Sequence, residues 1–173
     1  MSRMGGHLNM TNIDIGTLDY LIQKFGIETM VDVGCGPGGM VDYAKSVGLV
    51  VSGIDGDLSV APDVFHNFDN GVLTIPQTDL AWSVEFLEHV SEEFLDNVFS
   101  VFNQCKYVFC THNEKPGPWH SNCKPNDYWT EKFQQYGFEY DGATTGEIKT
   151  HSTMEREFVQ KTGNFFINAK GRI

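Results

Sequence analysis

The chain has 173 residues, with 23 Asp and Glu against 12 Lys and Arg, and a formal net charge of −11 at pH 7. This length suits a single domain spanning 1–173, and the few cationic residues form no cluster of the kind that nucleic-acid binding requires, so nucleic acid is disfavoured as the main partner. No apolar run approaches the roughly 20 residues of a membrane span, and no pair of the four cysteines has the C-x-x-C spacing of a zinc site.

The first segment, "MSRMGGHLNMTN", has no apolar core of the kind that a secretory signal contains. We therefore expect residues 1–12 to be a flexible tail and the protein to be cytoplasmic. A chain of this length leaves little room for a separate substrate domain. A large polymeric acceptor would then require a partner chain or a homodimer.

The first half of the chain predicts two strands that flank a helix, after one leading helix. Apolar residues at helical spacing predict that leading helix, with Asp14 as its N-cap and Gly26 just after its end. "ETMVDVG" and "LVVSGID" are short, β-branched runs typical of buried strands. The helix between them, "GGMVDYAKSVG", is expected to bury a face with Met40, Tyr43, Ala44 and Val47.

The second half continues the alternation of strands and helices. "DVFHNF", "DLAWSV" and "KYVFCT" are predicted strands, and "SEEFLDNVFSVFNQC" is a predicted helix that Ser91 caps. A Pro- and Gly-rich loop, "HNEKPGPWHSNCKP", leads to a helix, "NDYWTEKFQQYG", with Trp129 on its buried face. The last predicted strands are "FEYDG" and "NFFINAK", and no element is predicted between them.

A glycine-rich turn follows the first strand, in "VDVGCGPGG". Gly34, Gly36 and Gly38 lack Cβ atoms, so the backbone can turn sharply there and approach a ligand closely. Asp32 precedes the turn and would repel a phosphate, so it suits a ligand that carries an ammonium group. Asp55 ends the second strand, where an acidic side chain can accept hydrogen bonds from a ribose diol.

The stretches "VDVGCGPGG", "GIDGD" and "DLAWSVEFLEHV" together resemble the class I S-adenosylmethionine-dependent methyltransferases, of the type 11 and type 23 kinds. The resemblance implies an α/β, Rossmann-like fold: a doubly wound, mostly parallel sheet of seven strands with helices on both faces and the last strand antiparallel. It implies S-adenosylmethionine as the cofactor. The residues that it places at the cofactor are Asp32, Gly34, Cys35, Gly36, Gly38, Asp55, Gly56, Phe68, Asp69, Val84 and Glu85. Phe68 would flank the adenine, although a plain core role fits it nearly as well.

An acidic and histidine cluster follows the strand "DLAWSV". Glu85, Glu88 and His89 have i, i+3, i+4 spacing and would share one face of a helical turn. Two carboxylates and an imidazole suit Mg²⁺, Mn²⁺, Fe²⁺ or Zn²⁺. The loop after "KYVFCT" offers a fourth ligand, for which we favour His120 over the residues 112–114.

The E-x-x-E-H pattern with a distal histidine resembles two kinds of metal-assisted methyltransferase. These are the small-RNA 3′-terminal 2′-O-methyltransferases and the ubiquinone-pathway O-methyltransferases, and the resemblance implies a metal that grips vicinal oxygens of the acceptor. Many related enzymes carry similar segments without a metal. In that case His89 or His120 becomes the leading general base, with Glu88 also in the catalytic group.

The sequence therefore predicts an O-methyltransferase, or less readily an N-methyltransferase, that acts on a small polar acceptor. The loop with Trp119 is the expected lid over that acceptor. A module that binds S-adenosylmethionine without turnover is one alternative. A metal-dependent RNA 2′-O-methyltransferase is another, and the net charge of −11 weighs against it.

Overall fold

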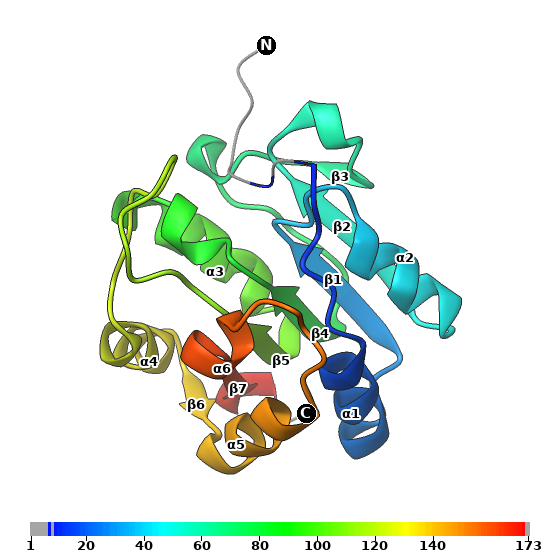
Figure 1. The fold of residues 1–173 in the computed structure, drawn as a ribbon. Helices are drawn as coiled ribbons and strands as arrows, with labels where there is room; N and C mark the ends of the chain where they lie inside the picture. Colours follow the sequence, from blue (N-terminus) through cyan, green and yellow to red (C-terminus); the bar gives the residue numbers. More distant parts are fainter. Residues whose placement is uncertain (1–6, 8, 172–173) are drawn as a thin grey trace.

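Seven strands join into one sheet in the order β3-β2-β1-β4-β5-β7-β6 (Figure 1). The computed structural model describes residues 7 and 9–171. The strands are β1 Thr29–Val33, β2 Val50–Asp55, β3 Val64–Phe65, β4 Thr78–Ser83, β5 Cys105–Cys110, β6 Phe138–Tyr140 and β7 Asn164–Asn168. The α-helices are α1 Ile15–Phe25, α2 Gly39–Ser46, α3 Leu95–Phe102, α4 Asn126–Gln135, α5 Gly142–His151 and α6 Phe158–Thr162.

The sheet is parallel except for β7, which runs antiparallel to both β5 and β6. This confirms the predicted doubly wound, seven-stranded sheet with its last strand antiparallel. The strands that follow β1 are added on one side of it, as β2 and β3, whereas β4 and β5 lie on its other side. The strand order therefore reverses between β1 and β4, and open α/β sheets bind ligands at such a switch point. The carboxyl ends of β1, β2, β4 and β5 lie at the same edge of the sheet, and we call it the upper edge.

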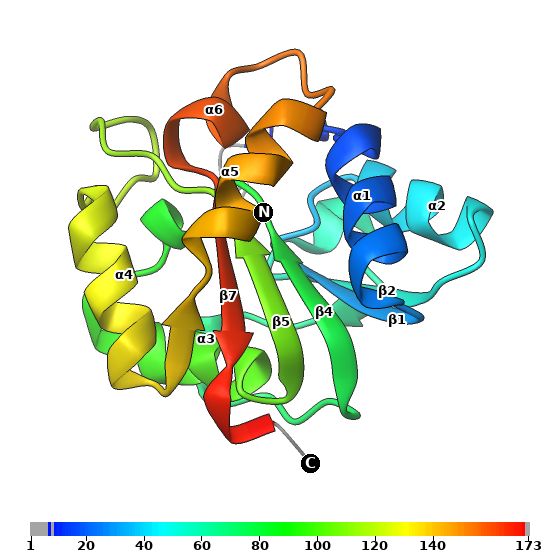
Figure 2. The ribbon, with the colours of Figure 1, turned by 90° about the horizontal axis from the view of Figure 1, so that it is seen from below.

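Helices cover both faces of the sheet (Figure 2). Buried apolar side chains of α1, α2, α5 and α6 form one core cluster with strand residues such as Leu80, Trp82 and Phe109. Those of α3 and α4 form the other, against Val31, Ala81 and other strand residues. The two apolar layers hold the sheet rigid, so the side chains at its upper edge have fixed positions.

The predicted caps of α1 are confirmed. Asp14 Oδ1 accepts a hydrogen bond of 3.0 Å from the backbone N–H of Thr17, which satisfies one of the free N–H groups at the start of the helix. Gly26 follows the helix in the left-handed region at φ 63°, and its N–H donates to the Ile22 carbonyl.

Three local predictions are wrong. Val47 is 44% exposed because α2 already ends at Ser46. Ser91 makes no capping bond with its side chain, because the short 3-10 turn Glu92–Phe94 separates it from α3. The third strand is only Val64–Phe65, because the Asn67 side chain accepts a hydrogen bond from Asp69 N and turns the chain into a 3-10 helix.

The structure also contains two helices that the sequence did not predict, α5 and α6, between β6 and β7. Asp141 caps α5, and its Oδ1 accepts a hydrogen bond of 2.9 Å from Thr144 N. In the described part of the chain, no helix combines the length and the apolar character that crossing a membrane requires.

Part of the predicted N-terminal tail, 1–6 and 8, lies outside the described residues. The remainder contacts the glycine turn. Thr11 Oγ1 accepts a hydrogen bond of 3.1 Å from Gly39 N, and the His7 imidazole lies 3.2 Å from the Asp57 carboxylate. These residues therefore cover one side of the region where the predicted cofactor site lies.

Candidate active site

The glycine turn joins β1 to α2 with three left-handed residues. Gly34, Gly36 and Gly38 have φ angles of 80°, 51° and 85°, which residues with a Cβ rarely adopt. Gly34 has a second reason to be glycine: a Cβ there would lie 2.4 Å from a ring carbon of Phe86. The Gly34 N–H donates to the Ile54 carbonyl at 2.9 Å, so the turn is tied to the neighbouring strand β2.

Asp55, at the end of β2, holds this turn in place. Its Oδ2 accepts a hydrogen bond of 2.8 Å from Gly36 N, and its Oδ1 accepts one of 2.8 Å from Asp57 N. Each carboxylate oxygen keeps a further lone pair for a ligand. The sequence suggested only a ribose contact for Asp55 and missed its role in shaping the turn. Gly56, between the two aspartates, is half-buried.

Asp32 lies below the turn and is 3% exposed. Burial, reinforced by the charge of Asp55, raises the pKa of Asp32 to about 8. None of the described residues donates a hydrogen bond to its carboxylate. A buried carboxylate without donors is costly, and a cationic ligand above the turn would relieve that cost.

The other residues predicted at the cofactor divide between core and surface. Phe68 is 5% exposed and packs edge-on against Phe86, with ring centroids 5.9 Å apart, so its side chain belongs to the core. Asp69 is exposed on the 3-10 helix Phe68–Asn70. Val84 is half-buried after β4 and packs against the core cluster of α1 and α2.

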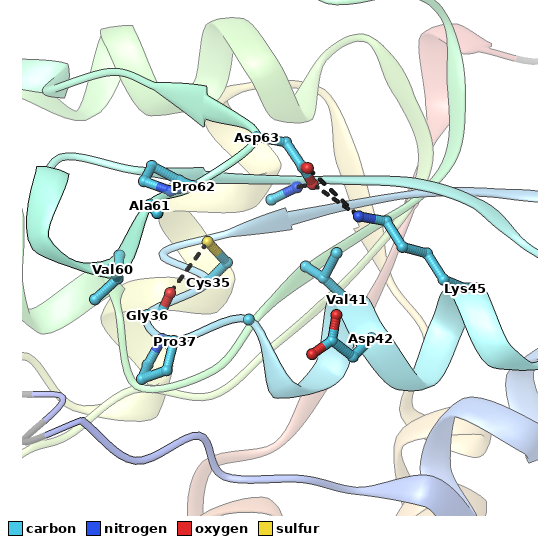
Figure 3. A pocket seen from close by; sticks show the side chains of 12 residues that line it. Cys35, Gly36, Pro37, Val41, Asp42, Lys45, Val60, Ala61, Pro62 and Asp63 are labelled. Atoms are coloured by element: carbon cyan, nitrogen blue, oxygen red, sulfur yellow. Dashed lines mark hydrogen bonds and ion pairs between the residues drawn. The ribbon is translucent and has the colours of Figure 1, made fainter.

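Cys35 does not point toward the upper edge. Its side chain lines a small pocket of about 100 Å³ between the glycine turn, α2 and the segment before β3 (Figure 3). Its Sγ lies 3.5 Å from the Gly36 carbonyl, and the ion pair of Lys45 with Asp63 lies beside the pocket. Burial raises the pKa of the Cys35 thiol, so it is inert at neutral pH.

The predicted metal ligands come together only in part. Ligand atoms of Glu88, His89 and His120 all lie within 4.8 Å of one another, and we call these three residues the EHH cluster. Leu87–His89 form a 3-10 turn after β4, and His120 reaches over from the loop that follows β5. His120, rather than His112 or Glu114, is thus the loop residue that joins Glu88 and His89 within the described chain.

Glu85 lies outside the EHH cluster, which corrects the predicted set of four ligands and the predicted shared face of Glu85, Glu88 and His89. Its backbone is left-handed at φ 52°, so residues 85–89 do not form one continuous helical turn. Its Oε1 accepts a hydrogen bond of 2.9 Å from Thr111 Oγ1, and its Oε2 accepts one of 3.3 Å from the amide of Asn113. No pattern in the sequence points to these two partners, because both lie on a distant segment.

Both imidazoles of the EHH cluster are held in one orientation. His89 Nδ1 lies 3.0 Å from the Trp119 carbonyl, and His120 Nδ1 lies 2.8 Å from the Lys115 carbonyl. A carbonyl only accepts, so each Nδ1 carries a proton, and in the neutral imidazole Nε2 then keeps a free lone pair. Burial lowers the pKa of His89, which favours this neutral form.

Glu88 is the buried member of the cluster, at 1% exposure. Burial, and then the nearby charge of Glu85, raise its pKa to about 8. Its Oε2 has no hydrogen-bond partner among the described residues. One carboxylate and two imidazoles, with ligand atoms within 4.8 Å of one another, form a donor set that suits a divalent transition metal.

Comparison with known proteins identifies the fold. No protein-family model matches the chain, so nothing supports the type 11 or type 23 subclass, and no curated protein matches it either. Among solved structures, the methyltransferase domain of bacterial CtHen1-CN superposes with a TM-score of 0.60 at 15% identity, over 88% of this chain and 95% of that one. The plantazolicin methyltransferase BamL, in complex with a triazolic desmethylPZN analog and SAH, gives a TM-score of 0.61 at 10% identity, over 90% and 83% of the two chains. The mitomycin 7-O-methyltransferase MmcR gives 0.56 at 12% identity, over 87% and 51%. The chain thus has the fold of the S-adenosylmethionine-dependent methyltransferases.

Proposed function

We propose that the protein is an S-adenosylmethionine-dependent methyltransferase that methylates an oxygen of a small polar acceptor with the help of a divalent metal ion. One observation carries the proposal. At the upper edge of a methyltransferase-type sheet, an unpaired buried carboxylate, Asp32, lies beneath a glycine turn, and the EHH cluster follows the adjacent strand β4.

The residues around the glycine turn fit the cofactor. The carboxylate of Asp32 suits the ammonium group of a methionine moiety, and the free lone pairs of Asp55 suit ribose hydroxyls. Gly38 leaves the backbone bare for a close approach, since nothing lies within 4 Å of a Cβ there. When bound, S-adenosylmethionine would supply an electrophilic methyl group on sulfur.

The EHH cluster fits a metal ion such as Mn²⁺, Fe²⁺ or Zn²⁺. The orphaned Glu88 Oε2 is the direct structural support, because a buried carboxylate oxygen without a partner is expensive. Backbone carbonyls hold both histidines through Nδ1, which is the usual outer-shell arrangement for metal-binding imidazoles. A metal there would lower the pKa of an acceptor hydroxyl. Glu85, which is hydrogen-bonded to Thr111 and Asn113, would then not touch the metal but would fix the chain just before Glu88.

The residues of this chain would contribute to catalysis mainly by positioning the acceptor and the cofactor. The strands fix Asp32 and the EHH cluster at one edge, and holding the acceptor oxygen in line with the methyl group supplies a large part of such a rate enhancement. The neutral imidazole of His89 or His120 is placed to take the acceptor proton if no metal is bound.

The testing experiment is methyl transfer from labelled S-adenosylmethionine into a small-molecule fraction of cell extract. We expect label in a low-molecular-weight product, and we expect Glu88→Gln to reduce the transfer at least tenfold while SAH still binds. SAH binding without any transfer would instead favour the non-catalytic binding module. Label in added RNA would favour the RNA 2′-O-methyltransferase.

A further inference from the structure

Apart from the Asp32 carboxylate, the buried side-chain atoms without a hydrogen-bond partner gather in one region. In the described part of the chain, those fully shielded from solvent belong to four residues, Glu88, His112, Asn122 and Trp129. Each of the four is at most 1% exposed. They lie below or beside the loop 113–125, and we call them together the polar recess.

Contacts link the four residues into one group. The Glu88 carbonyl accepts a hydrogen bond of 2.9 Å from Asn122 N, which joins the loop to the EHH cluster. The Trp129 ring lies 5.8 Å from the His112 ring and 5.2 Å from the ring of Tyr128. The Asn122 side chain also lies close enough to interact with the Tyr128 hydroxyl, although no hydrogen bond of ordinary geometry joins the two. His112 follows Cys110 by two residues on β5 and its extension, so both face α4 and Glu88.

Unpaired atoms of this kind are not general in the molecule. Asn168 is 3% exposed, and its amide nitrogen donates to the carbonyls of Cys105 and Asn103 while its oxygen accepts from Lys170 N. Asn164 is likewise paired. Because each unpaired buried group is destabilising, four such residues beside the proposed active site favour partners supplied by a bound molecule.

The chemistry of the recess limits what that molecule can be. Donors are the indole N–H of Trp129 and the amide of Asn122, and acceptors are the Asn122 oxygen and Glu88 Oε2. His112 adds one donor and one acceptor, since burial lowers its pKa to about 4 and keeps it neutral. The four residues include no Lys or Arg, so the recess itself offers a phosphate or carboxylate no cationic side chain, and an anionic group could be compensated only by the metal of the EHH cluster.

We propose that the polar recess binds the methyl acceptor, and that the acceptor is a neutral, hydroxyl-rich small molecule; this rests on the proposed methyltransferase function. Hydroxyl groups both donate and accept, which matches the mixed set in the recess. The recess adjoins Glu88, so an acceptor held there presents its oxygens to the EHH cluster.

Entry requires the 113–125 loop to move. Trp119 on that loop is 62% exposed and has a left-handed φ of 67°, a strained conformation for an aromatic residue. The carbonyls of Trp119 and Lys115 orient His89 and His120. Opening the loop therefore loosens the EHH cluster, and closing it over the acceptor restores the cluster.

The first test compares two buried asparagines in the ligand-free protein. Asn122→Leu removes unpaired polar atoms, so its thermal midpoint should equal or exceed that of the wild type. Asn168→Leu removes three hydrogen bonds, and its midpoint should fall by roughly 5 °C. If Asn122→Leu lowers the midpoint as much as Asn168→Leu does, the Asn122 amide is already bonded in the empty protein, and the proposal is wrong.

The second test measures ligand binding by calorimetry with SAH and Mn²⁺ present. Catechol is the neutral probe with two adjacent oxygens, and salicylate is its anionic counterpart. We expect catechol to bind at least tenfold more tightly than salicylate, and we expect Asn122→Leu and Trp129→Phe each to weaken catechol at least tenfold. Asn168→Leu should leave catechol binding unchanged.

The outcomes separate this inference from the function on which it rests. If the wild type binds SAH but no catechol, or prefers salicylate, the neutral-acceptor assignment fails while the methyltransferase proposal stands. If Asn122→Leu and Trp129→Phe bind catechol as well as the wild type does, the recess is not the acceptor site. If the wild type binds no SAH, the proposed function fails first.

Discussion

Glu85 and Thr111 are linked by a reciprocal pair of hydrogen bonds. The Thr111 hydroxyl accepts from the Glu85 backbone N–H at 2.9 Å and donates to Glu85 Oε1 at 2.9 Å. This pair joins the end of β4 to the end of β5 and holds Glu85 in a left-handed conformation. It therefore sets where the chain turns toward the EHH cluster.

Replacing Thr111 should test this link. Thr111→Val keeps the side-chain shape but removes both bonds, and it leaves a partly buried carboxylate oxygen with one partner fewer. We expect the free energy of unfolding in urea to fall by about 1–3 kcal/mol. Thr150→Val, on the exposed side of α5, is the matched control and should change it by less than about 0.5 kcal/mol. Equal effects of the two changes would contradict the link.

Two glycines of the turn should respond differently to alanine. Gly34→Ala adds a Cβ 2.4 Å from Phe86 at a left-handed φ, so we expect a loss of several kcal/mol, more than about 3. Gly38→Ala has the same backbone strain but no atom within 4 Å, so about 1–2 kcal/mol is expected. Thermal unfolding measures both. If Gly38→Ala costs as much as Gly34→Ala, the contact with Phe86 is not the cause.

Asp32 should make the stability of the empty protein depend on pH. Its pKa is raised by burial from 3.8 to about 8, so the unfolded chain ionises first and the folded state loses stability as pH rises between about 4 and about 8. Asp32→Asn stays neutral. The free energy of unfolding in urea should therefore be higher for Asp32→Asn than for the wild type, and this difference should grow from about pH 5 to about pH 8.

The exposed Asp69 provides the control for this experiment. Asp69→Asn should show no such growing advantage over the same pH range. An advantage of Asp32→Asn that is the same at both ends of the range would mean that Asp32 ionises with an ordinary affinity for protons. The burial argument for a cationic ligand would then lose its basis.

The EHH cluster should bind Mn²⁺ or Zn²⁺ through its two imidazoles. His89→Gln and His120→Gln each remove one nitrogen ligand, so metal affinity measured by titration should fall at least tenfold, or roughly 1.4 kcal/mol. His151→Gln, on the exposed end of α5, should have no effect. Metal uptake by the wild type that neither cluster variant reduces would place the metal elsewhere.

Much of the fold could be predicted because its signals are local. Asp14 and Gly26 mark the ends of α1, and the glycine turn between two β-branched runs marks a βαβ unit. By contrast, α5 has the sequence "GATTGEIKTH", whose only large apolar residue is Ile148. The helix is stabilised by its N-cap, Asp141, and by the stacking of its last residue, His151, on Tyr20 of α1. No local pattern predicts it.

The candidate site divides in the same way. Glu88 and His89 could be placed at the upper edge because they follow the strand β4. The loop after the next strand, β5, contains His120. The orientation of Glu85 could not be predicted, because it depends on Thr111 and Asn113, which reach it only through the pairing of β4 with β5. Spacing along the chain therefore located the site but did not give its geometry.

The most direct test is a crystal structure of the protein grown with SAH and Mn²⁺, with anomalous data to locate the metal. We expect SAH across the glycine turn, with its ammonium group at Asp32 and its ribose at Asp55, and one Mn²⁺ held by Glu88, His89 and His120. SAH bound away from the turn, or an EHH cluster with no anomalous peak although Mn²⁺ is bound elsewhere, would contradict this expectation.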